Sequence, residues 1–469
     1  MIHHASYHST RSTALKHSFE DILLAGLAPD GGLYVPSHLP HLSPAEIMRL
    51  AQLPYAALAY EIIALFVGDV ISPKELRNLI DAPYASFRHP AVTPLVQLDH
   101  QHMILELFHG ETLAFKDVAL QFLGRILDYV LQKRSEKLVI LGATSGDTGS
   151  AAIAGCRGRA SMDVVILYPH GRVSEVQRRQ MTTIYDNNVH CLAVDGTFDD
   201  CQAIVKTLFV DQEFRTQHPL GAVNSINWTR IIAQIVYYFY AAFRLGAPSR
   251  AVAFSVPTGN FGDIYAGFLA QRMGLPIHSL IIASNRNDIL TRCLTTGRYE
   301  IEPVVQTLSP SMDIGVSSNF ERLLYDLHDG DSVALAELMA SLKRTGGFSL
   351  SPHVHQKLQQ YFMAYAVDDA TIHATMQQEY ARSGMVIDPH TAVGVHAARQ
   401  AQMHAGRDDV VYVTLATAHP AKFPDAVQHA TQIHPALPRH LHDLYEKNER
   451  YTRIANDVEA VKAYITRLH

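Results

Sequence analysis

One lysine stands where covalent chemistry could use its amine. In the stretch FHGETLAFKDVAL, residues 108–120, Lys116 follows the apolar run LAF and precedes Asp117. Burial disfavours the charged form of an amine. A lysine at this place either extends its ammonium to water from the start of a helix or serves as a nucleophile. This stretch alone leaves both interpretations open.

A glycine-rich loop follows the strand predicted from Lys137. The stretch GATSGDTGSAAIAG begins at Gly142, and its glycines allow a tight turn while Thr144, Ser145 and Thr148 offer hydroxyls. The helix expected next would present free N–H groups and a positive dipole end, which suit a carboxylate or a phosphate. The sequence patterns of a P-loop and of a dinucleotide-binding turn are both absent here.

Two more loops of this kind lie further along the chain. VPTGNFGDIYAG, from Val256, again leads from a strand through glycines into a helix, and its N–H groups could surround a phosphate. TLATAHPAKFP, from Thr414, places a threonine, a histidine and a lysine at a strand tip, and the hydroxyl of Thr417 could bond a ring nitrogen or only cap a helix. Ligands of α/β proteins bind at the carboxyl ends of parallel strands. Together with Lys116, these parts suit pyridoxal phosphate, with a Schiff-base lysine, a phosphate cradle and a carboxylate loop.

The elements that must position these loops alternate along the chain from about residue 100. Short apolar, β-branched strands separated by helical stretches begin at Lys137, Asp163, Asn188, Ala251, His278 and Val410. Strands that are apolar on both faces indicate a parallel sheet covered by helices. We therefore predict an α/β fold with parallel-type sheets flanked by helices.

The 469 residues are too many for one ordinary core, so we expect several domains. Residues 1–92 are predicted to form a mostly helical N-terminal domain, interrupted by a turn and a short strand in APDGGLYVP. Residues 93–425 are predicted to form the main α/β domain. Residues 426–469 are predicted to form a helical tail packed back on the body.

Composition narrows the class of protein. The net charge is −6 and no basic block occurs, so we expect no nucleic-acid partner. No run approaches the roughly 20 apolar residues of a membrane span, and the start lacks the apolar core of a signal peptide. The four cysteines are scattered without a CxxC pair, which fits a reducing cytoplasm and argues against a zinc site. We expect no metal site, because no carboxylate or cysteine completes a ligand set beside the histidines.

Seven stretches together resemble one enzyme family. They are HGETLAFKD, GATSGDTGSAAIAG, NSINWTRIIAQIVYYF, VPTGNFGDIYAG, SPSMDIGVSSNFERL, DPHTAVG and LATAHPAKFP. The resemblance is to threonine synthases, pyridoxal-phosphate enzymes of fold type II related to the tryptophan synthase β family. LAPDGGLYVP resembles the start of the long bacterial and fungal form, so the resemblance runs nearly end to end.

This resemblance implies a reaction. O-phospho-L-homoserine and water would give L-threonine and phosphate by γ-elimination and β-hydration, in a monomer or a homodimer. A related phospholyase, which releases a 2-oxo acid and phosphate, would use the same motifs and remains an alternative. A catalytically silent binding module is the alternative from another class.

The resemblance also implies roles for individual residues. Lys116 would hold the cofactor and move protons, and Thr417 would meet the pyridine nitrogen. The cofactor phosphate would be held by Gly259, Asn260, Phe261, Gly262 and Asp263. The substrate carboxylate would be held by Ser145, Gly146, Asp147 and Thr148. The substrate phosphate would be held by Ser225 and Arg230, with help from Thr148 and Asn260. A smaller subdomain, about 137–225, would be mobile and close over the substrate.

Two residues depart from the family pattern. Glu111 stands where many relatives have proline, and we expect its carboxylate to face water. Gly315 stands where a longer polar side chain is expected. Neither has a role assigned above, so their bearing on substrate preference stays open.

Overall fold

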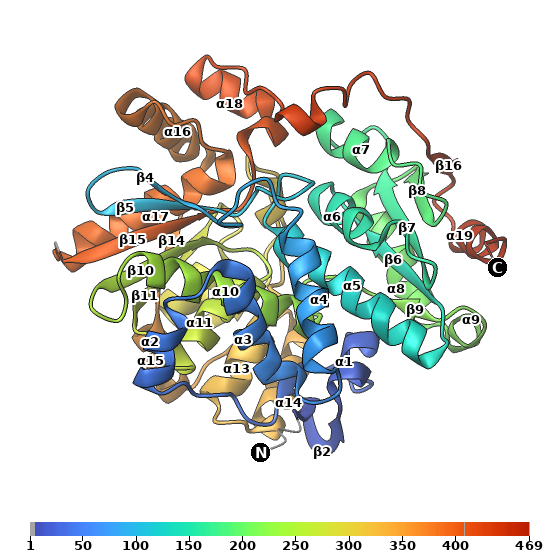
Figure 1. Ribbon diagram of the computed structural model, residues 1–469, viewed down its shortest axis with the longest axis horizontal. Coiled ribbons are helices and arrows are strands. Elements are labelled where there is room, and N and C mark those ends of the chain that lie inside the picture. Colours follow the sequence, from blue (N-terminus) through green and yellow to red (C-terminus); the bar gives the residue numbers. More distant parts are fainter. Residues whose placement is uncertain (1–4, 408, 469) are drawn as a thin grey trace.

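The computed structural model describes residues 5–407 and 409–468, and two sheets of mostly parallel strands form the body (Figure 1). The larger sheet has the strand order β14-β11-β10-β15-β5-β4, in which only β4 runs antiparallel to its neighbour. Its strands are β4 (Leu95–Gln97), β5 (His102–Glu106), β10 (Ala251–Pro257), β11 (Ile277–Ser284), β14 (Phe362–Ala366) and β15 (Val410–Ala416).

The smaller sheet is parallel throughout and has the order β16-β8-β7-β6-β9. Its strands are β6 (Leu138–Ala143), β7 (Met162–Pro169), β8 (Val189–Val194), β9 (Leu220–Gly221) and β16 (Thr452–Ile454). All six strands predicted from the sequence are present. Strands β5 and β14 were not predicted, because their half-buried residues interrupt the apolar pattern.

Both faces of the smaller sheet are buried, which explains its nearly continuous apolar strands. Val139 and Leu141 on β6 belong to the core cluster that includes α8 (Phe198–Val210) and α19 (Val458–Thr466). Leu138 and Ile140 belong to the cluster that includes α5 (Lys116–Arg134) and α6 (Asp147–Cys156). Alternate side chains of one strand therefore pack against different helices. Two short helices, α7 (Glu175–Thr182) and α9 (Gln212–Gln217), complete this lobe.

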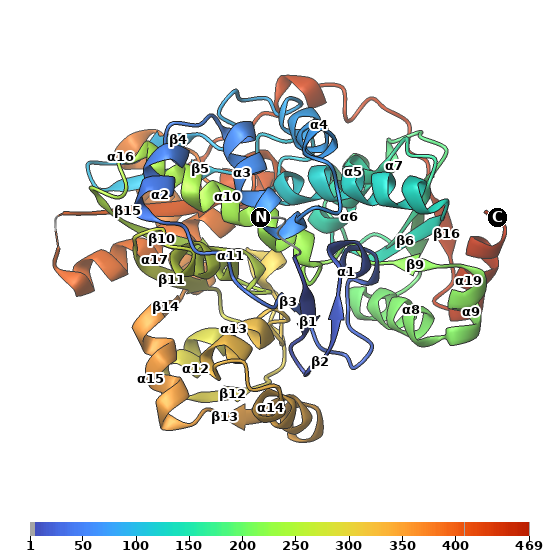
Figure 2. The same cartoon turned by 60° about the horizontal axis from the view of Figure 1, so that its bottom comes forward.

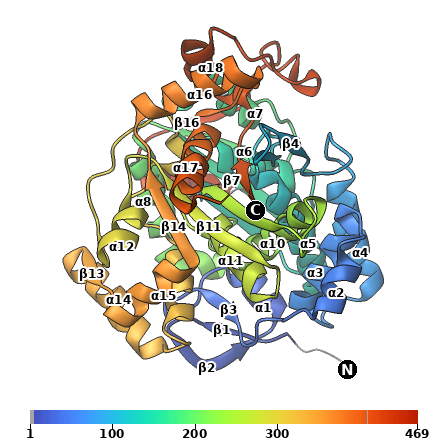
Figure 3. The same cartoon turned by 90° about the vertical axis from the view of Figure 1, so that its left-hand side faces the viewer.

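Helices cover both faces of the larger sheet as well. On one face α17 (Pro389–Ala405) packs across β11, β10 and β15, with α16 (Asp369–Ser383) beside it (Figure 3). On the other face lie α10 (Trp228–Arg244) and α11 (Gly262–Arg272), which contact each other extensively. Sixteen of the seventeen residues of α10 are buried, as its all-round apolar sequence predicts.

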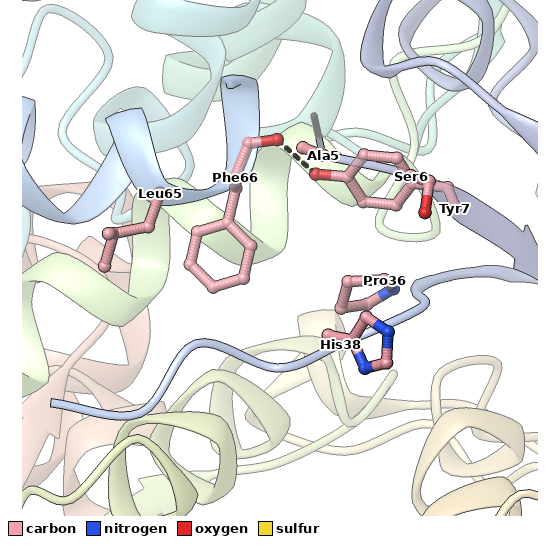
Figure 4. A pocket seen from close by; sticks show the side chains of 7 residues that line it. All are labelled: Ala5, Ser6, Tyr7, Pro36, His38, Leu65 and Phe66. Carbon is pink, nitrogen blue, oxygen red and sulfur yellow. Dashed lines mark hydrogen bonds between the residues drawn. The ribbon is translucent and has the colours of Figure 1, made fainter. Parts of the chain in front are cut away.

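The N-terminal domain combines four helices with a small antiparallel sheet of order β2-β1-β3. The helices are α1 (Phe19–Ala25), α2 (Pro44–Leu50), α3 (Tyr55–Val67) and α4 (Pro73–Tyr84), and the strands are β1 (Tyr7–Ser9), β2 (Ser12–His17) and β3 (Tyr34–Pro36). The predicted short strand is β3. Figure 4 shows the residues that line a small pocket between β1, the end of β3 and α3, where the Tyr7 hydroxyl donates to the Phe66 carbonyl. This pocket shares no residue with the predicted site.

A buried arginine joins the N-terminal domain to the main domain. Arg322 lies on α13 (Phe320–Leu327), in a lower group of elements that also contains α12 (Ile289–Thr296), β12 (Arg298–Glu300), α14 (Ser332–Thr345), β13 (Gly347–Ser349) and α15 (Pro352–Tyr361) (Figure 2). Its guanidinium donates to the carbonyls of Tyr34 at 3.0 Å and Ile226 at 2.7 Å, and to the Asn319 side chain at 2.6 Å. Breaking these contacts would leave a buried charge without partners.

The C-terminal tail, predicted to be helical, contains a strand as well as helices. After α18 (Pro424–Thr431) the chain runs past α7 and adds β16 to the edge of the smaller sheet before ending in α19 (Figure 1). Arg178 on α7 binds Glu449 of this segment at 2.8 Å, and the Thr182 hydroxyl donates to the same carboxylate at 2.7 Å. No apolar pattern marks β16 in the sequence, because its three residues are mostly exposed. None of the helices in the described ranges is long and apolar enough to cross a membrane.

Two glycines let α5 and α6 approach each other closely. A Cβ atom on Gly124 would lie 2.0 Å from the carbonyl oxygen of Gly155, and one on Gly155 would lie 2.3 Å from that of Leu120. Gly124 lies eight residues after Lys116, and Gly155 lies eight residues after Asp147. Each helix start is therefore about 12 Å from the shared contact. The crossing thus places Lys116 beside Asp147.

We expect Gly124→Ala to destabilise the protein, because its methyl group would collide with backbone atoms that cannot move away independently. The free energy of unfolding should fall by about 1–3 kcal/mol, measured by urea denaturation followed by circular dichroism. Gly142→Ala is the matched control, since its nearest non-neighbouring atom would be a flexible methyl carbon of Ile166 at 3.5 Å. Equal stability of the two variants would contradict the role of the helix crossing.

Candidate active site

The lysine loop and the tip of β15 lie side by side. Strands β5 and β15 are neighbours, and the chain segments beyond them stay paired. The Phe115 N–H donates to the Thr417 carbonyl at 2.8 Å, and the His419 N–H donates to the Leu113 carbonyl at 3.0 Å. The structure therefore places the residue before Lys116 directly against Thr417, so that these two predicted site residues lie on adjacent segments.

The conformation of the lysine loop is fixed by the residue after the lysine. The Asp117 carboxylate accepts the Thr112 N–H at 2.7 Å and the Thr112 hydroxyl at 2.8 Å. Between them, Leu113 has a φ of +63°, a left-handed conformation that few side chains adopt without support from their surroundings. Burial raises the pKa of Asp117 to about 7, against the opposing effect of the Thr112 hydrogen bonds.

The amine of Lys116 is buried at the first position of α5. The residue is 9% exposed, so the alternative of an ammonium extended into water is wrong. Its Nζ lies 3.5 Å from Asp147 Oδ2 and 4.9 Å from the centre of the Phe115 ring. Burial lowers the pKa of Lys116, Arg230 and Lys422 lower it further, and Asp147 opposes them. The environment thus favours a neutral amine more than water does.

The loop between β10 and α11 offers backbone N–H groups. The Ser317 hydroxyl donates to the Gly259 carbonyl at 2.7 Å, and the Asn319 side chain donates to the Asn260 carbonyl at 3.0 Å. Within the described chain, the N–H groups of Gly259, Asn260 and Phe261 donate to no protein group. Phe261 has a φ of +63° and caps α11, whose dipole end adds positive potential. The loop is therefore built to receive a phosphate.

Asp263 belongs to this loop, but its carboxylate is already engaged. Its Oδ1 accepts the hydroxyls of Tyr237 at 2.5 Å and Tyr238 at 2.9 Å, both on α10. Burial raises the pKa of Asp263 to about 6, although the two tyrosines and Arg230 lower it. The side chain therefore joins α10 to α11, which leaves only its backbone N–H for an anion.

The loop before α6 is the second loop expected to receive an anion. Gly146 has a φ of +146°, and a Cβ atom there would lie 2.4 Å from the Gln177 side chain, so only glycine fits. The Thr144 hydroxyl accepts the N–H groups of Gly146 and Gly149, each at 2.9 Å. Ser145 is exposed and Thr148 is half-buried at the start of the helix. Both are placed where a ligand carboxylate could reach them.

The carboxylate of Asp147 has a different position from the one expected. Its Oδ1 lies 2.8 Å from both Lys422 Nζ and Gln177 Nε2, and its Oδ2 accepts the Ser311 hydroxyl at 3.2 Å. Burial would raise the pKa of Asp147, but Lys422 and Lys116 hold it well below its usual range. A buried anion with these partners repels a substrate carboxylate. Only the Asp147 backbone N–H suits the carboxylate-binding role expected of it.

Arg230 and Ser225 lie near the Asn260 loop. Arg230 is 3% exposed and donates from Nη1 to the Val223 carbonyl at 3.3 Å, while its Nε finds no acceptor in the described chain. Burial lowers the pKa of Arg230 to about 10, so it remains a cation at neutral pH. Ser225 Oγ is 3.3 Å from Ser318 Oγ, which donates to the Asn260 side chain at 3.2 Å. A buried guanidinium with a free N–H is suited to a phosphate.

Sequence reasoning assigned no role to several residues of this site. Lys422 and Ser311 lie within the quoted stretches TLATAHPAKFP and SPSMDIGVSSNFERL, so the motifs marked their positions but not their contacts. Ser311 is held in turn by His390, whose Nε2 accepts the Ser311 N–H at 3.2 Å and whose Nδ1 lies 2.7 Å from Asp388. Gln177 lies on α7, where no motif points to it.

The two departures from the family pattern lie away from these contacts. Glu111 is about one third exposed in its side chain and forms a 2.8 Å ion pair with Arg157. A Cβ atom on Gly315 would lie 3.2 Å from a methyl carbon of Val304, so a longer side chain there would need a shift of its neighbour.

The residues present fit pyridoxal phosphate. A buried amine, a cradle of unused N–H groups and a nearby threonine hydroxyl match the aldehyde, the phosphate and the ring nitrogen of that cofactor. The unpaired Nε of Arg230 leaves a further cationic donor for a second anion. No group of three or more potential metal ligands occurs among the residues that the structure describes.

We expect Asp117→Asn to remove part of the pH dependence of stability. The folded protein keeps a proton on Asp117 up to about pH 7, whereas the unfolded chain loses it near pH 3.8. The wild type therefore loses stability from this group as the pH rises from 4 to 7. Asparagine does not titrate, and it can accept the Thr112 N–H and donate to the Thr112 hydroxyl.

The free energy of unfolding of Asp117→Asn, relative to wild type, should accordingly rise by about 1–4 kcal/mol between pH 4 and pH 7. Urea denaturation at several pH values measures this difference. The exposed Asp81→Asn variant on α4 serves as the control and should parallel the wild type. A constant difference for Asp117→Asn across this range would contradict the burial argument.

Comparisons with known proteins identify the family of the chain. Three family models match in order: "Threonine synthase N terminus" over residues 6–84, "Pyridoxal-phosphate dependent enzyme" over 87–353 and "Threonine synthase, C-terminal" over 391–465. The threonine synthase of Pseudomonas aeruginosa is 53% identical, with 98% of each chain covered, and that of Saccharomyces cerevisiae is 46% identical, with 90% of this chain and 88% of the yeast chain covered.

Solved structures give the same result. The crystal structure of pyridoxal-phosphate-bound threonine synthase from Brucella melitensis superposes with a TM-score of 0.96 at 49% identity, with 99% of each chain covered. Threonine synthase from yeast superposes with a TM-score of 0.95 at 43% identity, covering 99% of this chain and 98% of that one. The chain belongs to the threonine synthase family of pyridoxal-phosphate-dependent enzymes.

Proposed function

We propose that this protein converts O-phospho-L-homoserine and water to L-threonine and phosphate. The observation that carries the proposal is one buried amine, Lys116, between separate sites for anions. The open N–H groups of residues 259–261 suit one phosphate, and the unpaired Nε of Arg230 suits a second. The start of α6 suits a carboxylate. A phosphorylated amino acid bound beside a phosphorylated cofactor requires these two phosphate sites and one carboxylate site.

We propose the following division of roles. Lys116 links covalently to the cofactor, and the Thr417 hydroxyl meets the ring nitrogen. The cofactor phosphate binds Gly259, Asn260, Phe261, Gly262 and the backbone of Asp263. The substrate carboxylate binds Ser145, Thr148 and the backbone N–H of Asp147. Gly146, whose N–H already donates to Thr144, supplies the turn that presents these groups. The substrate phosphate binds Ser225, Arg230, Thr148 and Asn260.

When bound, pyridoxal phosphate supplies an electron sink that makes the protons on the carbons next to the substrate amine removable. The neutral amine of Lys116 would take one proton from Cα and one from Cβ and return one to Cγ and one to Cα, which its low-dielectric surroundings favour. The hydroxyl of water adds to Cβ, and its remaining proton balances the departing phosphate. Arg230 holds the substrate phosphate and stabilises the charge that develops as it leaves. The N–H groups of α6 fix the carboxylate and hence the orientation of the reacting carbons.

We further propose that the lobe of residues 137–225 closes over the substrate and excludes water until the addition step. The close backbone contact of Gly124 with Gly155 supports only a small rotation of this lobe about the α5–α6 crossing. The Ser311–Asp147 contact joins this lobe to the rest of the site and would tighten on closure.

The proposal also covers the cellular location and the oligomeric state of the protein. All four cysteines are free and buried, which supports a reducing, cytoplasmic location. Every residue assigned above comes from one chain, so a monomer or a homodimer would each contain complete sites. Light scattering of the purified protein distinguishes these two states.

The direct test is to incubate the purified protein with O-phospho-L-homoserine and to quantify phosphate, threonine and 2-oxobutyrate in one reaction. We expect threonine to equal phosphate. Phosphate matched by 2-oxobutyrate would instead identify a phospholyase. Lys116→Ala should lose both the visible absorption of the attached cofactor and the activity, whereas the exposed Lys137→Ala should retain both.

A second prediction concerns Arg230. Arg230→Lys keeps the charge but loses the forked donor, so KM for O-phospho-L-homoserine should rise roughly ten- to a hundredfold in steady-state assays. Arg244→Lys, at the exposed end of the same helix, is the matched control. If Arg230→Lys weakens cofactor binding and leaves KM unchanged, then Arg230 belongs to the cofactor phosphate and the assignment is wrong.

A further inference from the structure

Lys422 is a fully buried cation that no step described so far uses. It ends the short 3-10 helix η2 (Pro420–Lys422) after β15 and is 0% exposed. Its Nζ lies 2.7 Å from the Thr112 carbonyl, 3.0 Å from Gln180 Oε1 and 2.8 Å from Asp147 Oδ1. An ammonium has three N–H donors, and these three acceptors use all of them. Lys422 thereby connects the lysine loop, α7 and the start of α6.

Asp147 consequently lies between two lysines. Lys422 is 2.8 Å from its Oδ1, and Lys116 is 3.5 Å from its Oδ2. The other two partners of this carboxylate, Gln177 and Ser311, carry no charge. If Lys422 were absent, Lys116 would be the sole contacting cation for a buried carboxylate. Every step that removes the charge of Lys116 would then leave that carboxylate unpaired, which is costly in a protein interior.

We propose that Lys422 is a positioning residue that remains the partner of Asp147 throughout the reaction, so that Lys116 can lose its charge. With both lysines charged, the three groups carry one net positive charge. With Lys116 neutral or covalently linked, they carry none, and Asp147 stays paired. Lys422 thus separates two roles that one lysine could not fill: it neutralises Asp147, while Lys116 gains and loses protons. This inference rests on the proposed covalent role of Lys116.

The other charged groups around Lys116 do not replace Lys422. Arg230 from α10 also lowers the pKa of Lys116, but its guanidinium contacts the Val223 carbonyl and not Asp147. Asp263 from α11 is engaged by Tyr237 and Tyr238. Among the groups that the structure describes around the amine, Lys422 alone combines a positive charge with direct contact to the Asp147 carboxylate.

The pH dependence of cofactor attachment tests this inference. Full-length protein freed of cofactor is mixed with pyridoxal phosphate across a range of pH, and attachment is followed by visible absorption. Borohydride trapping and peptide mapping identify the modified residue. Attachment requires the neutral amine, so its rate rises with pH around the pKa of Lys116. Lys422→Met should move this midpoint to higher pH. At a fixed lower pH, attachment should then be about tenfold slower for each pH unit that the midpoint rises.

Four companion variants separate charge from packing. Asp147→Asn should move the midpoint to lower pH, and the double variant Lys422→Met/Asp147→Asn should return toward the wild type. Lys422→Arg retains the positive charge, so its pH midpoint of attachment should be nearer to that of the wild type than the midpoint of Lys422→Met is. Gln180→Met removes an uncharged contact of Lys422 and should leave the midpoint unchanged.

If Lys422→Met slows cofactor attachment equally at every pH and leaves the pH midpoint unchanged, then Lys422 has only a packing role and the inference is overturned. If Lys422→Met does not fold, as judged by circular dichroism, the comparison of Asp147→Asn with the double variant replaces it. The double variant must then have the higher midpoint, and equal midpoints would overturn the inference. Attachment that persists in Lys116→Ala would instead refute the proposed role of Lys116, which is a distinguishable result.

Discussion

The close crossing of α5 and α6 is the constraint on which the site depends. Each helix begins at a residue of the site, Lys116 or Asp147, and each carries a glycine eight residues later at the shared contact. The main chains meet there without side chains between them, so the relative position of the two helix starts is set by backbone atoms. Loop flexibility therefore contributes little to the 3.5 Å separation of amine and carboxylate.

The site concentrates buried charge that a structural core would avoid. Lys116, Asp147, Arg230 and Lys422 are each less than 10% exposed. Buried ion pairs stabilise a fold weakly at best, because desolvation offsets their attraction. The proposed chemistry accounts for their presence here, because a lysine that changes its charge needs surroundings in which both of its states are tolerated. The surrounding apolar sheets and the buried Arg322 that joins the N-terminal domain provide the stability that this cluster does not.

The sequence was most informative where one local rule decides the structure. Continuous apolar runs identified the six longer strands of the two large sheets, and the positive φ of Gly146 follows from a glycine that turns a strand into a helix. Lys116 could be singled out because an isolated amine within an apolar run is unusual. The contacts of Asp147 could not be predicted, since Gln177, Ser311 and Lys422 converge on it from distant segments. For the same reason β16 was missed: three mostly exposed residues become a strand only because β8 offers an edge.

The position of β16 in the sequence also affects how the smaller sheet folds. The strand β16 that completes the smaller sheet is Thr452–Ile454, whereas the other four strands lie between residues 138 and 221. During synthesis, β8 therefore stays an open edge until the chain has been extended past residue 454. An open parallel edge invites pairing with other chains. Loss of the C-terminal segment would thus act first on solubility and assembly of this lobe, at a site remote from the chemistry.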